Sequence, residues 1–240
     1  MSKIALLHTT EEHKKKTIDK IILDSSPVPT YTLLLILSIV IVTIGLVLGS
    51  ESIVIGGMLV SPLLSPIASL AMGVVVNDQK LITRSIYVLG KSVVVVFAIS
   101  FLIALIVPVE LNQEILGRTN ASLMYLYIAI ASGIAASFSY VKESFSERII
   151  GVAVAIALLP PLSVTGIGLA ILNKEIIFGS LELFASNFIG IFLSFVIVFS
   201  LFGFFTVRFE ATKKLKEETE NIKKYKKEKE DLKESMKDDM

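Results

Sequence analysis

The chain has 240 residues, 53% of them hydrophobic, and a mean hydropathy of +0.76. That hydrophobic share exceeds the roughly 45–50% typical of globular domains, even though glycine is counted in the latter figure. The formal net charge is +1, and the charged residues gather near the two ends and in short connecting stretches, so no basic face favours nucleic acid as a partner. Without cysteine, and with both histidines in the polar N-terminal segment, neither a disulfide nor a metal site is expected.

The N-terminal segment, residues 1–29, is polar and expected to be cytoplasmic. Thr9 and Glu12 have the spacing of a helix-capping box, and three isoleucines follow at helical spacing before Pro27 and Pro29. This pattern favours a short interfacial helix, but it also fits a disordered basic tail. The one short apolar stretch is too small for the core of a signal peptide.

Six apolar segments follow, each long enough to cross a lipid bilayer. A hydrocarbon core about 30 Å thick requires about 20 helical residues. The expected spans are Thr30–Leu48, Ile53–Val76, Ile86–Val107, Ala121–Val141, Ile149–Leu172 and Leu181–Val207. The sequence therefore predicts an all-α integral membrane protein with a six-span domain over residues 30–207.

The basic residues of the loops predict the orientation of these spans. Lysine and arginine lie before span one, after span two and after span four, whereas the intervening loops carry at most one basic residue each. Because lysine and arginine resist translocation, both termini are expected in the cytoplasm.

Prolines interrupt the second and fifth spans near their middle. Pro62 and Pro66 lie four residues apart in span two, and Pro160 and Pro161 are adjacent in span five. An interior proline removes a backbone donor and clashes with the carbonyl four residues earlier. We therefore expect both helices to be broken at proline.

The two broken spans also resemble each other in sequence. An offset of 95 residues places Gly56 on Gly151, Leu64 on Leu159, Pro66 on Pro161 and Gly73 on Gly168. Each span is the middle member of a group of three, so repeat one is expected at 30–107 and repeat two at 121–207. A unit of three crossings reverses direction, and the second copy is therefore expected to be inverted.

The breaks are the predicted functional site. Lipid cannot satisfy exposed backbone groups, so broken helices must be buried in protein or line a watery cavity. We expect the two breaks to face each other and to bind a small solute or ion. The candidate residues are Ser61, Pro62, Ser65, Pro66, Pro160, Pro161, Ser163, Thr165 and Asn187. Taken singly, these hydroxyl residues are also typical partners of kinked backbone.

Two acidic residues stand at roughly equivalent places outside the breaks. Glu51 precedes span two and Glu147 precedes span five, where each carboxylate suits helix capping or gating. No carboxylate or histidine lies near the centre of a span, and neither a phosphate-binding glycine loop nor a catalytic constellation is present. The sequence therefore predicts neither an enzyme nor a cofactor.

The C-terminal tail, residues 208–240, changes abruptly to lysine and glutamate. Apolar residues recur there on an approximate heptad, which fits either a coiled coil or a solvated helix. The wide apolar surfaces of six spans, with stripes of small residues, also predict a homo-oligomer.

Two stretches resemble a known family. GLVLGSESIVIGGMLVSPLLSPIASLAMG, residues 45–73, and IIGVAVAIALLPPLSVTGIGLA, residues 149–170, are similar to the uncharacterised hydrophobic-domain membrane protein family, domain of unknown function 389. The resemblance covers spans one to six, includes Asn187 as a recurrent position, and implies a multi-pass protein of a prokaryotic plasma membrane. It implies no substrate.

Two functional hypotheses follow from these patterns. The paired breaks favour a transporter or channel-like protein for a small solute or ion. The charged tail favours instead a non-transporting membrane scaffold or sensor that acts through its cytoplasmic helix.

Overall fold

A computed structural model describes residues 9–142 and 147–238, without the side chains of 147–157, 208–210, 226 and 229–238. Every regular element in these ranges is a helix, which confirms the predicted all-α class for the described residues. The elements in chain order are α1 (Glu11–Asp24), α2 (Pro29–Val47), α3 (Glu51–Val60), α4 (Leu64–Val75), α5 (Gln79–Ile106), α6 (Gln113–Leu116), α7 (Leu123–Val141), α8 (Glu147–Ala170), α9 (Lys174–Leu201), η1 (Phe204–Val207) and α10 (Arg208–Asp238).

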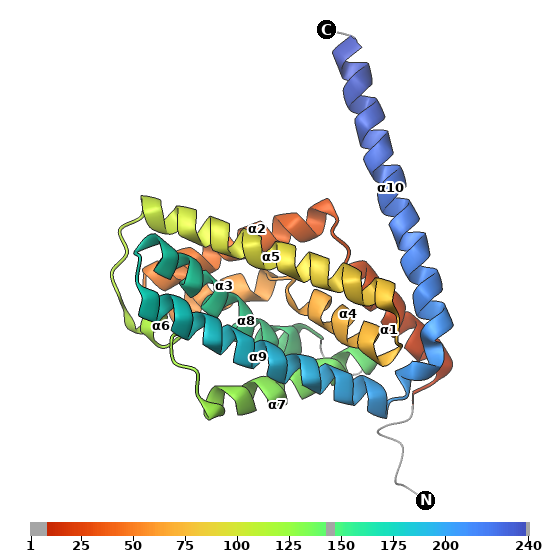
Figure 1. Ribbon diagram of the computed structural model, residues 1–240, viewed down its shortest axis with the longest axis horizontal. Coiled ribbons are helices and arrows are strands. Elements are labelled where there is room, and N and C mark those ends of the chain that lie inside the picture. The colour runs from red at the N-terminus through yellow and green to blue at the C-terminus, as the bar shows by residue number, and fades with distance from the viewer. Residues whose placement is uncertain (1–8, 143–146, 239–240) are drawn as a thin grey trace, which may run out of the picture.

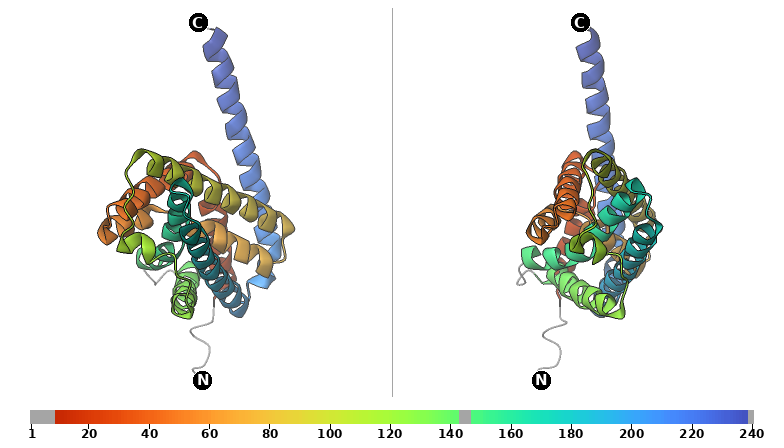
Figure 2. Two further views of the ribbon diagram at one scale, coloured as in Figure 1. Left: turned by 60° about the vertical axis from the view of Figure 1, so that its left-hand side comes forward. Right: turned by 90° about the vertical axis from the view of Figure 1, so that its left-hand side faces the viewer.

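The long apolar helices form one bundle (Figures 1 and 2). Among the described residues, α2, α5, α7 and α9 are apolar and long enough to cross a membrane, and α3 with α4 makes a fifth such unit if the bent pair is one span. The described side-chain-bearing part of α8, Leu158–Ala170, is a shorter apolar helix that packs against α2, α3, α5, α7 and α9. The fold is therefore compatible with a multi-pass membrane protein.

The second expected span is broken as predicted. Helix α3 ends at Val60, Ser61 follows with an extended backbone, and α4 begins at Leu64 with its axis turned by 50°. Pro62 lies inside this break. Pro66 is the third residue of α4, where a missing N–H is tolerated because the first N–H groups of a helix have no intrahelical partner.

The predicted break in the fifth span is wrong. Helix α8 is continuous from Glu147 to Ala170 with Pro160 and Pro161 inside it. A proline ring holds φ near the helical value, and packed membrane-type helices tolerate the lost donors because neighbouring groups compensate. Here both prolines are buried, and the Thr165 hydroxyl donates to the carbonyl of Pro161 at 3.0 Å.

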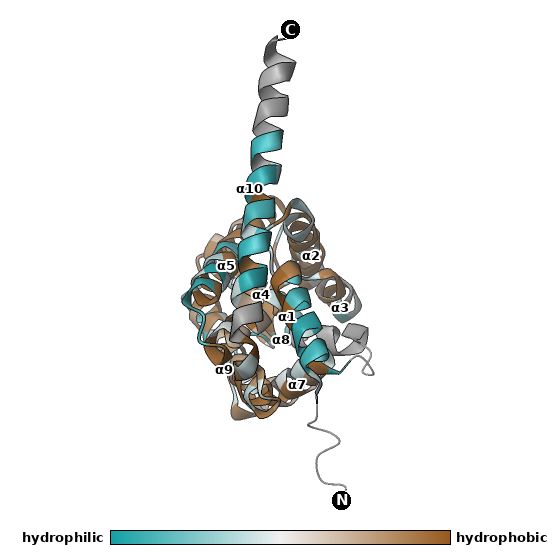
Figure 3. Ribbon diagram, turned by 90° about the vertical axis from the view of Figure 1, so that its right-hand side faces the viewer, coloured by the Kyte–Doolittle hydropathy of each residue, from teal (hydrophilic) through white to brown (hydrophobic). Residues whose placement is uncertain are grey.

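The terminal helices close one end of the bundle. On α1, Ile18, Ile21 and Ile22 are fully buried in the same apolar cluster as Leu215 of α10. Thr10, and not Thr9 of the predicted capping box, caps α1, because the Thr10 side chain accepts from the N–H of His13 at 3.3 Å. Figure 3 views this end and shows hydrophilic residues along α1 and α10 against the largely hydrophobic helices behind them. The apolar stripe of α1 therefore packs into the bundle.

Two helix junctions share one geometry at an offset of 95 residues. Asn77, between α4 and α5, and Leu172, between α8 and α9, both have a φ of 54°. Asp78 then caps α5 by accepting from the second and third N–H groups of that helix, and Asn173 caps α9 in the same way. The α2–α3 junction has a related form, with Gly49 at a φ of 65° and the N–H of Ser50 donating to the Gly45 carbonyl, so this turn is a general helix connection of the bundle.

Close glycine contacts repeat at the same junctions. A Cβ on Gly73 would lie 3.0 Å from the backbone nitrogen of Ile82, and one on Gly168 would lie 3.1 Å from that of Ile177. In each case the glycine lets the helix before the turn approach the helix after it.

The two junctions lie at opposite ends of the bundle (Figure 1). At the end formed by the terminal helices, the Thr212 hydroxyl of α10 donates to Asp78. At the other end, Gly179 in the second turn of α9 lies against the carbonyl of Thr119, which follows α6. The two matching pairs of helices therefore run in opposite directions.

Candidate functional site

The break between α3 and α4 lies against the middle of the bundle. Helix α3 packs on α2 and α8, and it approaches α2 closely because Gly57 carries no side chain: a Cβ there would lie 2.9 Å from the nitrogen of Val42. Leu63, within the break, belongs to the same buried apolar cluster as Leu159 and Leu162 of α8. The break in α3–α4 and the proline-bearing stretch of α8 therefore share one core.

Two serines in this region have buried hydroxyls without a hydrogen-bond partner among the described residues. They are Ser61 at the end of α3 and Ser163 of α8, which is fully buried. Leaving a buried hydroxyl unpaired costs about 1–3 kcal/mol, so native proteins seldom do so without a water or a ligand. Both hydroxyls are therefore candidates for a hydrogen bond to a water or to a bound molecule.

Ser65, unlike Ser61 and Ser163, has a hydroxyl partner on another helix. Its hydroxyl lies 3.4 Å from the hydroxyl of Tyr140 on α7, and the ring of Tyr140 lies beneath the ammonium group of Lys20, 5.8 Å from the ring centroid. The carbonyl of Tyr140 accepts from Thr17 of α1 at 3.1 Å. The start of α4 is therefore coupled through Tyr140 to the N-terminal helix, a connection that sequence reasoning missed.

The remaining hydroxyl and amide candidates lie deeper between helices. Thr165 shares a hydrogen bond of 2.8 Å with Ser180 of α9, so its hydroxyl joins α8 to α9. Asn187 is 3% exposed on α9, and the equivalent residue at the 95-residue offset is Ser92 on α5. The hydroxyl of Thr165 is thus engaged by α9 rather than by the α3–α4 break.

The acidic candidates stand at helix starts. Glu51 is exposed in the first turn of α3, where its negative charge suits the amino end of the helix. Glu147 is the first residue of α8, and its side chain lies outside the described part of the structure. Among the described residues no group of three or more His, Cys, Asp or Glu could hold a metal ion.

A row of buried hydroxyl pairs ties α5 to its neighbours. Ser92 pairs with Tyr31 of α2 at 2.9 Å, and Ser100 pairs with Thr43 at 2.9 Å. Ser85, one step earlier on the same face, donates to Ser69 of α4 at 2.9 Å. Sequence reasoning missed this face, although serines spaced seven and eight residues apart share one side of a helix.

Comparisons with known proteins agree on the family. The family model described as domain of unknown function (DUF389) matches residues 58–193. Uncharacterized protein MJ0678 of Methanocaldococcus jannaschii is 34% identical over 188 residues, which is 78% of this chain and 58% of that protein. No solved structure matches. The family match covers the α3–α4 break, the proline stretch of α8 and Asn187, and the chain therefore belongs to the family of domain of unknown function 389.

Proposed function

We propose that the protein is a six-span membrane transporter or channel-like protein that moves a small solute or ion past the α3–α4 break. The observation that carries the proposal is the break itself: a 50° interruption of an apolar helix pair, packed on α8, with two partnerless buried hydroxyls from Ser61 and Ser163. The solute would replace the missing partners of these hydroxyls. The proposal requires neither catalysis nor a cofactor.

A 3+3 inverted repeat is part of this proposal. It is supported by the matching α4–α5 and α8–α9 junctions, which lie at opposite ends of the bundle. It is also supported by a reciprocal packing exchange, because α5 of the first repeat packs on α8 while α9 of the second packs on α4. In this arrangement α8 is the sixth membrane-crossing unit, equivalent to the α3–α4 pair.

The proposed orientation places the end formed by α1 and α10 in the cytoplasm. Both helices carry many basic residues, and Lys80 and Arg84 lie at the same end, at the start of α5. Basic residues favour the cytoplasmic side of a membrane. The archaeal relative supports the plasma membrane of a prokaryote as the proposed location.

The chemistry of the break favours a solute that both donates and accepts hydrogen bonds. The carboxyl end of α3 offers carbonyl oxygens, and the amino end of α4 offers N–H groups. The serine hydroxyls can serve in either role. A small neutral solute, or an ion that keeps part of its hydration shell, fits these groups.

The test is a flux assay in liposomes with labelled anions, cations and small neutral metabolites. Ser61→Ala and Ser163→Ala should lower the flux of the transported species about three- to tenfold, the usual effect of one lost neutral hydrogen bond. Ser38→Ala is the matched control, because this buried hydroxyl bonds within its own helix to the Leu35 carbonyl. Absence of flux for every species in the panel would contradict the proposal.

A membrane scaffold or sensor is the second candidate, favoured by α10. This helix extends far beyond the bundle in Figure 1, and its lysine and glutamate side chains suit a cytoplasmic partner. Truncation after Glu220 is the discriminating variant, because it keeps the buried Ala211 and Leu215 in place. A lost cellular phenotype with unchanged flux and assembly would favour the scaffold.

A further inference from the structure

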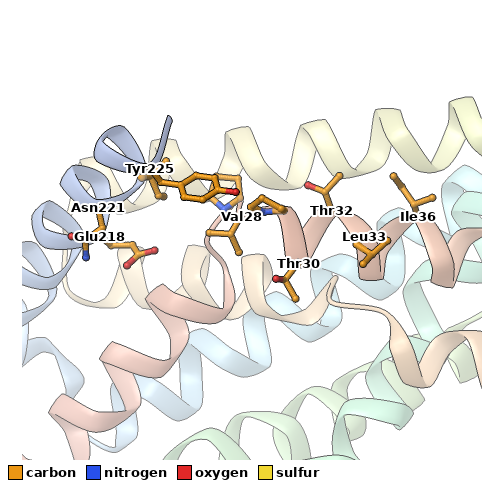
Figure 4. Close-up of a pocket in the computed structure, with 11 residues that line it drawn as sticks. Val28, Thr30, Thr32, Leu33, Ile36, Glu218, Asn221 and Tyr225 are labelled. Carbon is orange, nitrogen blue, oxygen red and sulfur yellow. The ribbon is translucent and has the colours of Figure 1, made fainter. Parts of the chain in front are cut away.

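The corner where α10 leaves the bundle contains two hollows with complementary chemistry. The first, here called the α2–α10 groove, has a volume of about 850 Å³ and lies between the start of α2 and one face of α10 (Figure 4). From α10 it is lined by Glu218, Asn221, Ile222 and Tyr225, which share one helix face at positions i, i+3, i+4 and i+7.

The groove combines large apolar side chains of α2 with polar groups from both α2 and α10. Leu33 and Ile36 line it and are 56% and 37% exposed, on a side of α2 that presents further large apolar residues. Thr30, Asn221 and Tyr225 add a hydroxyl, an amide and a phenol. This mixed lining suits an amphipathic occupant with an acyl chain against Leu33 and Ile36.

The second hollow, here called the basic hollow, is a shallow and open depression along one face of α5. It is lined by Gln79, Lys80, Thr83, Arg84 and Tyr87. Each of these five side chains carries a hydrogen-bond donor, two of them are cationic, and none is a carboxylate. This set of groups suits a phosphate, and basic pockets at the cytoplasmic side of membrane helices bind anionic head groups.

Arg84 joins the two hollows. Its Nη2 donates to the Ser26 hydroxyl at 2.6 Å, just before the chain enters the groove at Pro27. The carboxylate of Glu218, which lines the groove, interacts electrostatically with the guanidinium group of Arg84. The Nη1 atom of Arg84 is buried and has no partner among the described residues. One donor of a charged group is therefore left for a ligand.

Two carboxylates, those of Asp78 and Glu218, lie near these cationic side chains. The carboxylate of Asp78 is occupied by the N–H groups of Lys80 and Leu81 and by the Thr212 hydroxyl. Hydrogen bonds from neutral groups leave the charge of Asp78 in place, so Asp78 and Glu218 offset the positive charge of Lys80 and Arg84. The preference for an anion rests instead on the lining of the basic hollow, which contains both cationic side chains and no carboxylate.

We propose that this corner binds an anionic phospholipid of the cytoplasmic leaflet, with its phosphate between Lys80 and Arg84 and an acyl chain in the α2–α10 groove. The inference rests on the proposed membrane orientation but not on the solute path. Free inorganic phosphate shares the head-group chemistry, but it leaves the apolar floor of Leu33 and Ile36 unfilled, so the lipid is the occupant that accounts for both hollows. Bound there, the lipid holds the base of α10 against α2 and α5.

The test uses the absence of tryptophan from the chain. Tyr225→Trp provides a reporter in the groove, and Tyr127→Trp on α7, a residue of similar exposure, provides a reporter elsewhere on the bundle. Each protein is reconstituted in zwitterionic bilayers that contain a minor fraction of brominated phosphatidylglycerol, which quenches tryptophan on contact. Quenching at position 225 should exceed quenching at position 127. It should also exceed the quenching expected if the brominated lipid were distributed randomly around the protein.

Charge variants of the Tyr225→Trp protein test the head-group contact. Lys80→Gln should reduce the preference for the brominated anionic lipid about fivefold, the usual effect of one basic residue near a membrane surface. Lys91→Gln is the matched control, because Lys91 is exposed on the same helix and lines neither hollow. This control should keep the full preference.

Three outcomes would overturn the proposal. They are equal quenching at the two reporters, a Lys80→Gln variant with unchanged preference, and Lys80-dependent binding of inorganic phosphate to the purified protein without any lipid preference. Liposome flux separates this site from the solute path. In the Tyr225→Trp protein, absent lipid preference with measurable flux contradicts the lipid site alone, whereas absent flux with measurable lipid preference contradicts the path alone.

Discussion

Lys14 shows how a single charged side chain holds the terminal helices on the bundle. Its ammonium group donates to the carbonyl of Gly203 at 3.1 Å and to the hydroxyl of Thr206 at 3.3 Å, and it pairs with Glu11 at 3.1 Å. The lysine side chain is 9% exposed, so these bonds are shielded from water. Together they fix α1 to the turn that leads into α10.

Lys14→Ala should lower the free energy of unfolding by about 1–3 kcal/mol, because it removes a shielded charged donor that serves three acceptors. Chemical denaturation in mild detergent measures the change. Lys16→Ala is the matched control: this side chain is 59% exposed and pairs with Glu12, so its loss should cost well under about 1 kcal/mol. Equal effects of the two variants would refute the role assigned to Lys14.

Adjacent glycines on α3 allow an equally local test. Gly57→Ala places a Cβ 2.7 Å from the side chain and 2.9 Å from the nitrogen of Val42, so α3 and α2 must separate. Gly56→Ala meets nothing within 4 Å and removes a flexible residue from a helix. We expect Gly57→Ala to lower the melting temperature in detergent and Gly56→Ala to leave it unchanged or raise it. The reverse order would show that α3 does not pack as described.

At the scale of elements, proline lies at the α3–α4 break and also inside the uninterrupted helix α8. Pro62 falls where the chain is already extended, and Pro66 falls in a first helical turn, so neither proline removes a hydrogen bond that its local structure would make. Pro160 and Pro161 lie inside a helix that packs against several other helices. The surroundings of a proline, as well as its presence, decide whether a helix ends.

Pro62→Ala should therefore reduce solute flux while the protein remains folded, because alanine allows α3 to extend into α4 and removes the open backbone groups of the break. Pro66→Ala should keep most of the flux, since the first turn of α4 needs no donor at that position. Paired measurements of flux and thermal unfolding distinguish lost function from lost folding. If Pro66→Ala loses as much flux as Pro62→Ala, the break has been assigned to the wrong proline.

At the scale of the whole molecule, the inverted repeat makes a symmetric prediction about sidedness. Gln79 begins α5 and Lys174 begins α9; both are exposed, and they are equivalent at the 95-residue offset. The chain contains no cysteine, so Gln79→Cys and Lys174→Cys each create a unique label site. In intact cells a membrane-impermeant thiol reagent should label position 174, and it should reach position 79 after permeabilisation. Labelling of both positions from the same side of the membrane would contradict the inverted repeat.

The apolar outer surface supports a proposal about assembly. Large hydrophobic side chains are exposed on α2, α5, α7 and α9, for example Leu33, Val94, Tyr127 and Ile197. Part of this surface can contact lipid, and part can pack against further copies of the chain. We expect native mass spectrometry in mild detergent to detect a homo-oligomer. A monomer under every gentle condition would contradict this proposal.

Sequence alone determined the features that depend on composition and local pattern. Long apolar runs predicted an all-helical protein, and α2, the α3–α4 pair, α5, α7 and α9 lie close to the expected segments because burial in an apolar medium requires runs of that length. The proline pattern likewise located the α3–α4 break. The quoted glycine and proline motifs identified the family.

Only the tertiary structure decided which local patterns persist. It keeps α8 continuous through two prolines, and it places the apolar face of α1 inside the bundle, because packing partners from distant parts of the chain compensate for local preferences. It also couples Ser65 to Tyr140 across 75 residues and brings Arg84 between Ser26 and α10. Such contacts depend on how the helices cross in space. The linear pattern of residues does not reveal that geometry.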